Sequence, residues 1–288
     1  MILGGIEAGG TKFVCVVGTE EGEILVRKVF DTTTPEETLG AVIDFFEEYQ
    51  LAALGIGSFG PVAINPDHPK YGSILETPKK GWEYTPILQI LEKGLGCPVA
   101  IDTDVNVAAL AEAEQGNARD IGSCLYLTVG TGIGGGFYNG DLLHGKLHPE
   151  MGHQLIPVAK DGFAGICPYH GNCLEGMASG PAIEARAGKK AQYLDERDPV
   201  WDDVAEAIAM GLVNYRMVLS PERIILGGGV MKQLHLFPKI QRRFYQLING
   251  YLSLSKEELE EHIQPPGLGD QAGSLGTLLL AARVLESQ

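Results

Sequence analysis

The sequence has few cysteines and no long hydrophobic run, and each shortage excludes a class of protein. Five cysteines are an odd and sparse number for a secreted scaffold held by disulfides, so we expect core residues or metal ligands instead. No apolar run approaches the ~20 residues of a membrane-spanning helix. The first residues also lack the basic start and long apolar core of a signal peptide. We therefore expect a cytoplasmic protein with no membrane partner.

Basic residues are in short supply as well. The 22 lysines and arginines are outnumbered by 37 aspartates and glutamates, which gives a formal net charge of −15. Such a surface as a whole repels nucleic acids and anionic membranes, so we expect no nucleic-acid partner. If the protein binds a nucleotide, the negative charge of the phosphates must be compensated locally by backbone N–H groups, by a lysine or by a metal cation.

The length and the pattern of elements favour an α/β protein of two domains. With 288 residues, of which 44% are hydrophobic, the chain is long enough for two domains of roughly 150 residues. Strand patterns alternate with helical ones, which is typical of α/β folds. The opening pattern of strand, glycine turn and strand returns at residues 123–138, as a duplicated domain would show. We place the boundary in 112–122, giving domains 1–115 and 116–288.

Three glycine-rich turns each follow an apolar strand: Gly9-Gly10-Thr11-Lys12, Gly130-Thr131-Gly132 and Gly227-Gly228-Gly229. Glycine lets a ligand approach the main chain closely, and successive N–H groups form an anion-binding concavity. One such turn alone could equally be a tight β-turn, but three of them favour the binding of nucleotide phosphates. None fits the P-loop pattern or the dinucleotide pattern G-x-G-x-x-G, so those two enzyme classes are disfavoured.

Acidic and amide side chains follow the strand expected at 98–102. They lie in the segment 102–106, at the carboxyl end of a strand, where α/β proteins usually place their chemistry. A hydroxyl group that attacks phosphorus needs a carboxylate to accept its proton, and we predict Asp104 for that role. Asp102 and Asn106 are equally explained as N-cap residues of the following helix.

Three soft or borderline metal ligands lie close together at C-x-x-H-x-x-C spacing, in Cys167, His170 and Cys173. A structural zinc site takes four such ligands, and His153 is the nearest fourth candidate. The competing candidates are His144 and His148. Two buried cysteines and a surface histidine would also explain the residues, but the density of ligands in one loop favours zinc. A closed site of this kind stabilises a loop and does not activate water.

Two glutamates flank the cluster. Glu150 lies three residues before His153, and Glu175 lies two residues after Cys173, so a metal held there would fix both carboxylates. Carboxylates accept hydrogen bonds from hydroxyl groups, which suits a sugar. The alternative is that each is an ordinary surface glutamate with no role in sugar binding.

These motifs, in this order, resemble the ROK family (repressor, open reading frame, kinase), and the resemblance covers roughly residues 2 to 285. Its most specific part is the E-x-G-H motif at 150–153 with the cysteine cluster that follows. Within the family, the sequence is most similar to bacterial zinc-containing fructokinases. The segments that carry the resemblance are 9–12, 103–106, 130–136, 150–153, 167–173 and 227–230.

The resemblance implies a two-domain actin-like, ribonuclease H-like (ASKHA) fold with an interdomain cleft and one phosphate-binding hairpin in each domain. The final helix, 275–286, is expected to pack back against the first domain. The implied ligands are ATP with Mg²⁺ and a hexose, and the implied assembly is a homodimer. The implied reaction is phosphorylation of D-fructose to fructose 6-phosphate.

The resemblance also implies roles for individual residues. Asp104 is the base and contacts the sugar together with Glu150, His153 and Glu175. The ligands of a structural Zn²⁺ are His153, Cys167, His170 and Cys173. The nucleotide contacts are Gly9, Gly10, Thr11, Lys12, Thr131, Gly132, Pro181, Gly227, Gly228, Gly229, Val230 and Met231.

Three positions depart from the family pattern. Glu7 stands where the family commonly has aspartate, so its role near Mg²⁺ stays open. Thr103 stands where the family often has asparagine, so a direct contact between this residue and the sugar stays open. His170 stands where many members have cysteine, which favours fructose over glucose. Mannose, glucose and N-acetylhexosamines stay open as acceptors, and so does the nucleotide preference. A sugar-responsive repressor is disfavoured by the acidic charge and by a first strand expected from Ile2.

Overall fold

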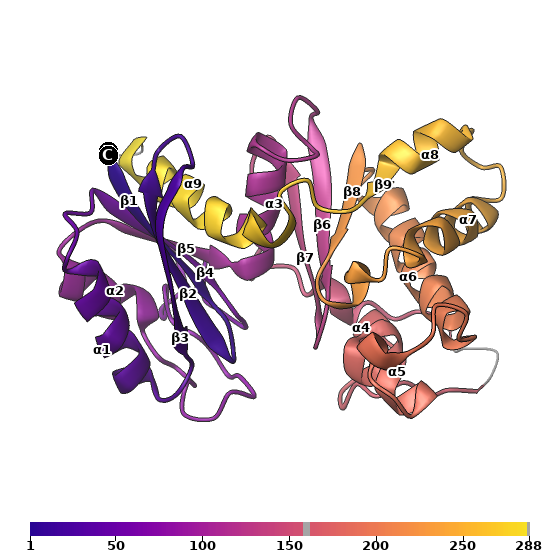
Figure 1. Cartoon of the computed structure of the whole chain (residues 1–288), viewed down its shortest axis with the longest axis horizontal. Coiled ribbons are helices and arrows are strands. Elements are labelled where there is room, and N and C mark those ends of the chain that lie inside the picture. The colour runs from indigo at the N-terminus through magenta and orange to yellow at the C-terminus, as the bar shows by residue number, and fades with distance from the viewer. Residues whose placement is uncertain (158–161, 287–288) are drawn as a thin grey trace. The chain divides into compact units, whose positions relative to one another are not determined.

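The computed structural model describes residues 1–157 and 162–286, and the chain divides by its internal contacts into two compact units (Figure 1). Unit 1 comprises residues 1–119, residues 141–149 and the segment that begins at Asp270. Unit 2 comprises residues 120–140 and 150–269. The chain therefore returns to unit 1 twice. The boundary between residues 115 and 116 stays a prediction.

Unit 1 contains a five-stranded sheet in the order β3-β2-β1-β4-β5. Its strands are β1 (Ile2–Ala8), β2 (Lys12–Thr19), β3 (Ile24–Asp31), β4 (Ala53–Ser58) and β5 (Val99–Thr103). The first three strands are antiparallel neighbours, whereas β4 runs parallel to β1 and β5 runs parallel to β4. Strands β1, β4 and β5 therefore bring their carboxyl ends to one edge of the sheet.

Four helices cover this sheet: α1 (Pro35–Phe46), α2 (Ile87–Leu95), α3 (Asp104–Glu114) and α9 (Ala272–Glu286). Helices α1 and α2 share one hydrophobic cluster with the sheet, in which Phe13, Phe46 and Ile56 are fully buried. Helices α3 and α9 pack against each other, and α9 also packs on β1 and β4. The final helix therefore belongs to the core of unit 1.

Glycine at position 55 is what lets α9 lie so close to the sheet. A Cβ atom built on Gly55 would collide with the backbone carbonyl of Thr277 and with the backbone nitrogen of Ala281. Both atoms belong to the main chain of α9 and cannot turn aside as a flexible side chain can. The strand and the helix therefore touch backbone to backbone at this point.

Unit 2 contains a four-stranded sheet in the order β7-β6-β8-β9. Its strands are β6 (Ser123–Val129), β7 (Ile133–Asn139), β8 (Arg223–Gly227) and β9 (Ile263–Gln264). Strands β6 and β7 form an antiparallel hairpin, and β8 runs parallel to β6. The same plan relates β1, β2 and β4, so the repeated sequence pattern corresponds to a repeated arrangement of three strands.

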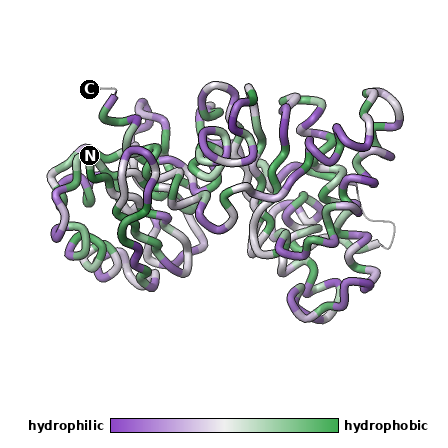
Figure 2. Tube along the Cα trace, turned by 45° about the horizontal axis from the view of Figure 1, so that its top comes forward, coloured by the Kyte–Doolittle hydropathy of each residue, from purple (hydrophilic) through white to green (hydrophobic). Residues whose placement is uncertain are grey.

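The helices of unit 2 are α4 (Leu174–Ala178), α5 (Gly180–Ala187), α6 (Val200–Val218), α7 (Leu236–Ile248) and α8 (Lys256–His262). Helix α6 buries Trp201, Ile208 and Leu212 in the largest hydrophobic cluster of the unit. Figure 2 shows hydrophobic stretches in the interior of each unit and many hydrophilic stretches on its outer turns, and the buried hydrophobic residues form separate clusters in the two units. Each unit therefore has a core of its own.

The strands expected from the sequence are present, and the helical boundaries differ by a few residues. Helix α9, for example, begins at Ala272 rather than at the expected Leu275. Helices α2, α4, α5 and α8 were not expected. All five cysteines are free. Among the residues described, no helix has the length and hydrophobicity needed to cross a membrane.

Candidate active site

The first glycine turn joins β1 to β2 and is held at its base by hydrogen bonds. The N–H of Gly9 donates to the carbonyl of Lys12 at 3.0 Å, and the Thr32 hydroxyl donates to the carbonyl of Gly9 at 2.7 Å. The side chains of Thr11 and Lys12 are exposed. The turn therefore presents a hydroxyl and an ammonium group from a fixed backbone.

The second glycine turn joins β6 to β7 and lies against the start of α5. The N–H of Gly130 donates to the carbonyl of Gly132 at 2.9 Å, and the carbonyl of Gly130 accepts from the N–H of Gly180 at 2.7 Å. Thr131 is exposed at the tip of the turn, and Pro181 follows Gly180 in the first turn of α5. Within unit 2 the structure thus brings Pro181 next to the predicted phosphate-binding turn.

The third glycine turn follows β8 and leads into a short 3₁₀ helix, η3 (Val230–Lys232). Gly228 has φ = +89°, and a Cβ atom there would meet the backbone of Val129, so only glycine suits this position. The side chains of Val230 and Met231 are buried in the core of unit 2. This turn therefore packs against the carboxyl end of β6, and only its backbone is left to meet a ligand.

The acidic segment after β5 separates into buried and exposed groups. Asp102 is 2% exposed, and its Oδ1 accepts from the N–H of Thr103 and from Nδ2 of Asn106, each at 2.7 Å. The N-cap of α3 is neither Asp102 nor Asn106 but Thr103, whose hydroxyl accepts from the N–H of Asn106 at 3.1 Å. Asp104 is exposed at the first position of α3. Only Asp104 of these residues therefore presents its carboxylate to solvent.

The two histidines that competed for the metal role, His144 and His148, belong to unit 1 and form hydrogen bonds within it. The Nε2 atom of His144 lies 2.8 Å from Oδ2 of Asp102, and Nε2 of His148 accepts from the N–H of Val62 at 3.2 Å. The hydrogen bond to the Asp102 carboxylate raises the pKa of His144. Neither contact could be foreseen from local sequence patterns, because the partners lie 42 and 86 residues away along the chain.

The four predicted metal ligands do come together in unit 2. Donor atoms of His153, Cys167, His170 and Cys173 all lie within 4.8 Å of one another. The Nδ1 atom of His153 is 3.8 Å from Sγ of Cys167 and 3.6 Å from Sγ of Cys173, and Nδ1 of His170 is 3.7 Å from Sγ of Cys167. Tetrahedral zinc with ordinary Zn–N and Zn–S bonds separates such atoms by about 3.6 Å. The group therefore has the spacing of a closed, four-coordinate metal site.

Two carboxylate residues predicted for the site, Glu175 and Glu150, lie next to this Cys/His group in the chain. Cys173 is the N-cap of α4, whose second residue is Glu175. The Oε2 atom of Glu175 accepts from the N–H of Ile133 at 2.9 Å, and its Oε1 lies 4.0 Å from Nε2 of His153. With Nδ1 turned toward the cysteines, His153 thus directs its second nitrogen toward a carboxylate. Glu150 precedes His153 in an exposed position at the start of η1 (Met151–His153).

Glu7 has a partner that the sequence did not reveal. The Ser274 hydroxyl at the start of α9 donates to Oε2 of Glu7 at 3.0 Å, and burial raises the pKa of the Glu7 carboxyl. Ser274 lies 267 residues from Glu7 along the chain, and only the expected return of the last helix to the first domain pointed toward such a contact.

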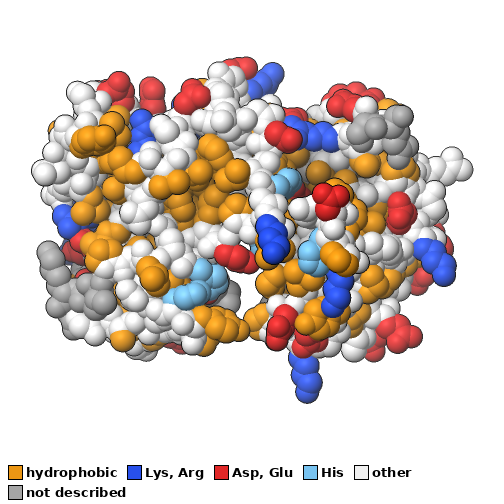
Figure 3. Space-filling view, turned by 180° about the vertical axis from the view of Figure 1, so that it is seen from behind, with side chains coloured by type: hydrophobic (Ala, Val, Ile, Leu, Met, Phe, Trp, Pro, Cys, Tyr) orange, Lys and Arg blue, Asp and Glu red, His pale blue; other side chains and the backbone are white. Residues whose placement is uncertain are grey.

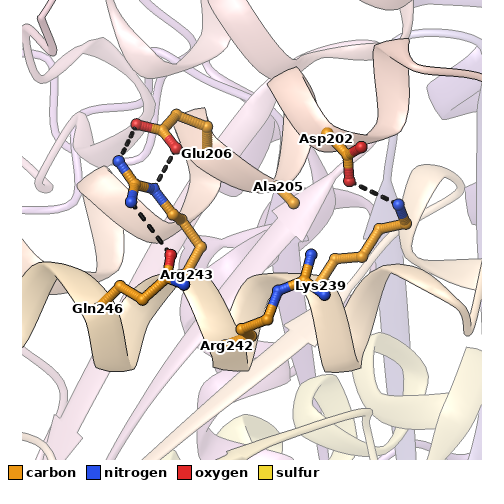
Figure 4. A pocket seen from close by; sticks show the side chains of 7 residues that line it. All are labelled: Asp202, Ala205, Glu206, Lys239, Arg242, Arg243 and Gln246. Carbon is orange, nitrogen blue, oxygen red and sulfur yellow. Dashed lines mark hydrogen bonds and ion pairs between the residues drawn. The ribbon is translucent and has the colours of Figure 1, made fainter.

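A separate cavity of about 240 Å³ lies between α6 and α7, away from the residues predicted for the site (Figure 4). Within it Lys239 pairs with Asp202, and Arg243 pairs with Glu206. Arg243 also donates to Gln246 at 3.1 Å. The carboxylates that line this cavity are therefore already engaged in ion pairs that link the two helices.

The acidic surplus is spread over the surface. On the face drawn in Figure 3, the acidic and basic side chains of the described residues are scattered rather than gathered by sign. The net charge of −15 therefore does not form one continuous acidic patch on that face.

Relatives of known sequence match the chain along its whole length. A Bacillus subtilis (strain 168) protein is 49% identical over 291 residues, covering 100% of this chain and 97% of its own length. A protein of Pediococcus pentosaceus, named fructokinase, is 44% identical over 289 residues and is covered completely, as is this chain. The similarity therefore includes both units.

Solved structures share the fold. The ROK hexokinase from Thermus thermophilus matches with a TM-score of 0.83 at 28% identity, covering 100% of both chains. A ROK family glucokinase from Streptomyces griseus, solved in complex with glucose and AMPPNP, matches with a TM-score of 0.76 at 27% identity, covering 98% of this chain and 100% of the other. These neighbours confirm the expected actin-like α/β fold. Since the sequence also matches the ROK family over residues 3–284, the chain belongs to that family.

Proposed function

We propose that this protein is a fructokinase that transfers the γ-phosphoryl group of ATP to the 6-hydroxyl of D-fructose. The observation that carries the proposal is the 44% identity, over the full length of both chains, to the fructokinase of Pediococcus pentosaceus. The Streptomyces griseus glucokinase, solved with glucose and AMPPNP, supports a hexose and ATP as the two ligands.

Asp104 is the general base in this proposal. Its exposure at the carboxyl end of β5 supports the role, because a base must reach the hydroxyl that it deprotonates. Asp102 is a poor alternative, since it is 2% exposed and both of its oxygens already accept hydrogen bonds. As the 6-hydroxyl attacks phosphorus, its proton passes to the Asp104 carboxylate, and the bond to ADP breaks.

The glycine turns bind the phosphates. The first turn would supply backbone N–H groups, the Thr11 hydroxyl and the charge of Lys12, and the second would supply the Thr131 hydroxyl beside the start of α5. The third turn and Pro181 would contact the rest of the nucleotide. Mg²⁺ bound to ATP neutralises phosphate charge, which an acidic protein with few lysines cannot do alone.

The sugar contacts come from the metal-bound region of unit 2. Glu150, His153 and Glu175 offer carboxylate and imidazole groups to the hydroxyls of a hexose, and the proposed Zn²⁺ holds His153 and the start of α4 in place. Zn²⁺ is structural in this proposal, because His153, Cys167, His170 and Cys173 fill its four positions. A homodimer, inferred from the family resemblance, completes the proposal and can be checked by light scattering.

The proposal is tested by a coupled kinase assay with ATP, Mg²⁺ and a panel of hexoses. We expect kcat/KM for fructose to exceed that for mannose, glucose and N-acetylglucosamine, with fructose 6-phosphate as the product identified by NMR. Preferential phosphorylation of glucose or an N-acetylhexosamine would assign a different acceptor. Hydrolysis of ATP without any phosphorylated sugar would reject the kinase function itself.

A further inference from the structure

We propose that His144 is a positioning residue for phosphoryl transfer, acting through Asp102 on the first turn of α3, which carries Asp104. This inference rests on the proposed function in one respect only, namely that Asp104 is the base. His144 lies in the segment 141–149, which leaves unit 2 after β7 and returns to unit 1. His144, which the sequence suggested only as a metal ligand, would thus act through its contact with Asp102.

Asp102 is the point at which three groups meet. Its Oδ1 accepts from the N–H of Thr103 and from Nδ2 of Asn106, and its Oδ2 accepts from Nε2 of His144 at 2.8 Å. Thr103 and Asn106 belong to the N-cap and first turn of α3, on either side of Asp104. Oδ1 of Asn106 is buried and has no hydrogen-bond partner among residues 1–157 and 162–286. The Asp102 carboxylate is therefore the contact that fixes the Asn106 side chain.

A carboxylate in this position needs a cation. The side chain of Asp102 is 3% exposed, so water cannot compensate its charge, and burying an unpaired charge is costly. Two neutral amide donors serve Oδ1, and the imidazole ring serves Oδ2. A protonated His144 turns that last contact into a charge-assisted hydrogen bond, which is roughly twice as strong as a neutral one.

His144 can exchange its proton with solvent, since 41% of its side chain is exposed. The charged and titratable groups around the pair come from several elements. Asp141, from the same segment, adds negative charge near His144 and pairs with Arg283 of α9 at 3.2 Å. Arg283 also pairs with Glu114 of α3 at 2.8 Å. Burial, and after it the negative charge of Asp102, raises the pKa of the Tyr71 phenol.

These contacts determine whether the Asp102–His144 pair is strengthened or weakened as the pH rises. The hydrogen bond to Asp102 raises the pKa of His144, so the charged pair is complete at low pH and is lost as pH rises through that raised value. Above it a neutral imidazole still donates to Asp102, but more weakly. The first turn of α3 then holds Asp104 less firmly, so we expect kcat to fall about fivefold while KM for ATP changes little.

The experiment compares the wild-type protein with His144→Gln, which keeps an N–H donor but never carries a charge. The quantity measured is the ratio of the two kcat values between pH 6 and 9.5, because the titrations of ATP and of Asp104 then cancel. We expect a ratio of about five at low pH that declines to about one at high pH. His68→Gln is the matched control, since His68 accepts from the backbone N–H of Lys70 and pairs with no carboxylate in the part of the chain that the structure describes, and its ratio should stay near one throughout.

A second measurement needs no activity. In an NMR titration of the folded wild-type protein, His144 should titrate above its ordinary pKa of 6.5, and Asp102→Asn should lower that pKa, because it removes the carboxylate that raises it. A wild-type His144 that titrates at or below the ordinary value overturns the inference, even if Asp102→Asn does not fold. A ratio of kcat values that is constant with pH also overturns it, and fructose phosphorylation would still support the proposed function. Absence of any kinase activity would reject the proposed function, while the titration still tests the pair.

Discussion

Gly55 of β4 lies directly against the backbone carbonyl of Thr277 in α9, with no room for a methyl group between them. Gly55→Ala should therefore force strand and helix apart and lower the free energy of unfolding by about 1–3 kcal/mol or more. Urea-induced unfolding, followed by circular dichroism, measures the change.

The control is a glycine of the same unit that has free space where a side chain would lie. Gly40 lies on the exposed side of α1, and a Cβ atom there would meet nothing within 4 Å. Gly40→Ala should stabilise the protein by about 0.5–1 kcal/mol, because alanine favours the helix. Equal effects of the two substitutions would show that helix α9 does not press on β4.

Replacing Asp104 with asparagine should remove the base and leave the fold intact. We expect kcat to fall about 10²–10⁴-fold, since that is the usual contribution of general-base catalysis. Sugar binding, followed by isothermal titration calorimetry, should change little because the amide still accepts a hydrogen bond. Asp44→Asn, on an exposed position of α1, should keep full activity. Unchanged kcat in Asp104→Asn would remove Asp104 from the mechanism.

Elemental analysis of the purified protein should find about one zinc per chain, as a closed four-ligand site requires. Chelation should lower the unfolding temperature, because metal binding contributes to folding. Cys173→Ser should lose the zinc and much of the activity together, since Cys173 both ligates the metal and caps the helix that carries Glu175. Cys97→Ser, at a buried cysteine of unit 1, should keep the zinc. A fully active wild-type protein with far less than one zinc per chain would contradict the site.

Glu7→Gln should stabilise the protein at neutral pH. Burial raises the pKa of Glu7 in the folded state, so above that raised pKa the folded protein carries a charge that its surroundings disfavour. Below the ordinary value of 4.5 the carboxyl is protonated in both states, and this difference disappears. Differential scanning calorimetry should therefore show a higher unfolding temperature for the variant at pH 7.5 and little change near pH 4.

The control for that experiment is Glu48→Gln, at an exposed position after α1. The difference in unfolding temperature between this variant and the wild type should be the same at both pH values. A variant Glu7→Gln that unfolds at a lower temperature than wild type at pH 7.5 would mean that the carboxylate is stabilised by more than its bond to Ser274.

The features that the sequence predicted best are local ones. A glycine turn between two strands depends on adjacent residues, so the turns at 9–12 and 130–132 could be identified from the order of residues alone. The Cys/His group that could hold a metal was also identifiable, because three of its four residues lie within the loop 167–173. Helix α2 was missed although Ile87, Leu88 and Leu91 follow a helical period, so that signal was available. Helix α4 offered none, because it is short and its N-cap is Cys173 rather than one of the usual N-cap residues.

What the sequence could not provide is which acidic residue of 102–106 faces solvent. Asp102 and Asp104 are two residues apart and chemically identical, and only the tertiary structure buries one and exposes the other. The contacts of His144 and Ser274 have the same origin, since each joins segments that meet only after the chain has folded.

The place of α9 in the chain has a consequence for biosynthesis. The ribosome makes strands β1 and β4 early, yet the helix that covers them emerges only after every residue of unit 2. The face of the sheet that carries Leu3, Val16 and Gly55 must therefore wait for its cover while unit 2 can already fold. The half that is translated first is thus the half that is completed last, and a nascent chain released before α9 would expose a hydrophobic sheet to chaperones and proteases.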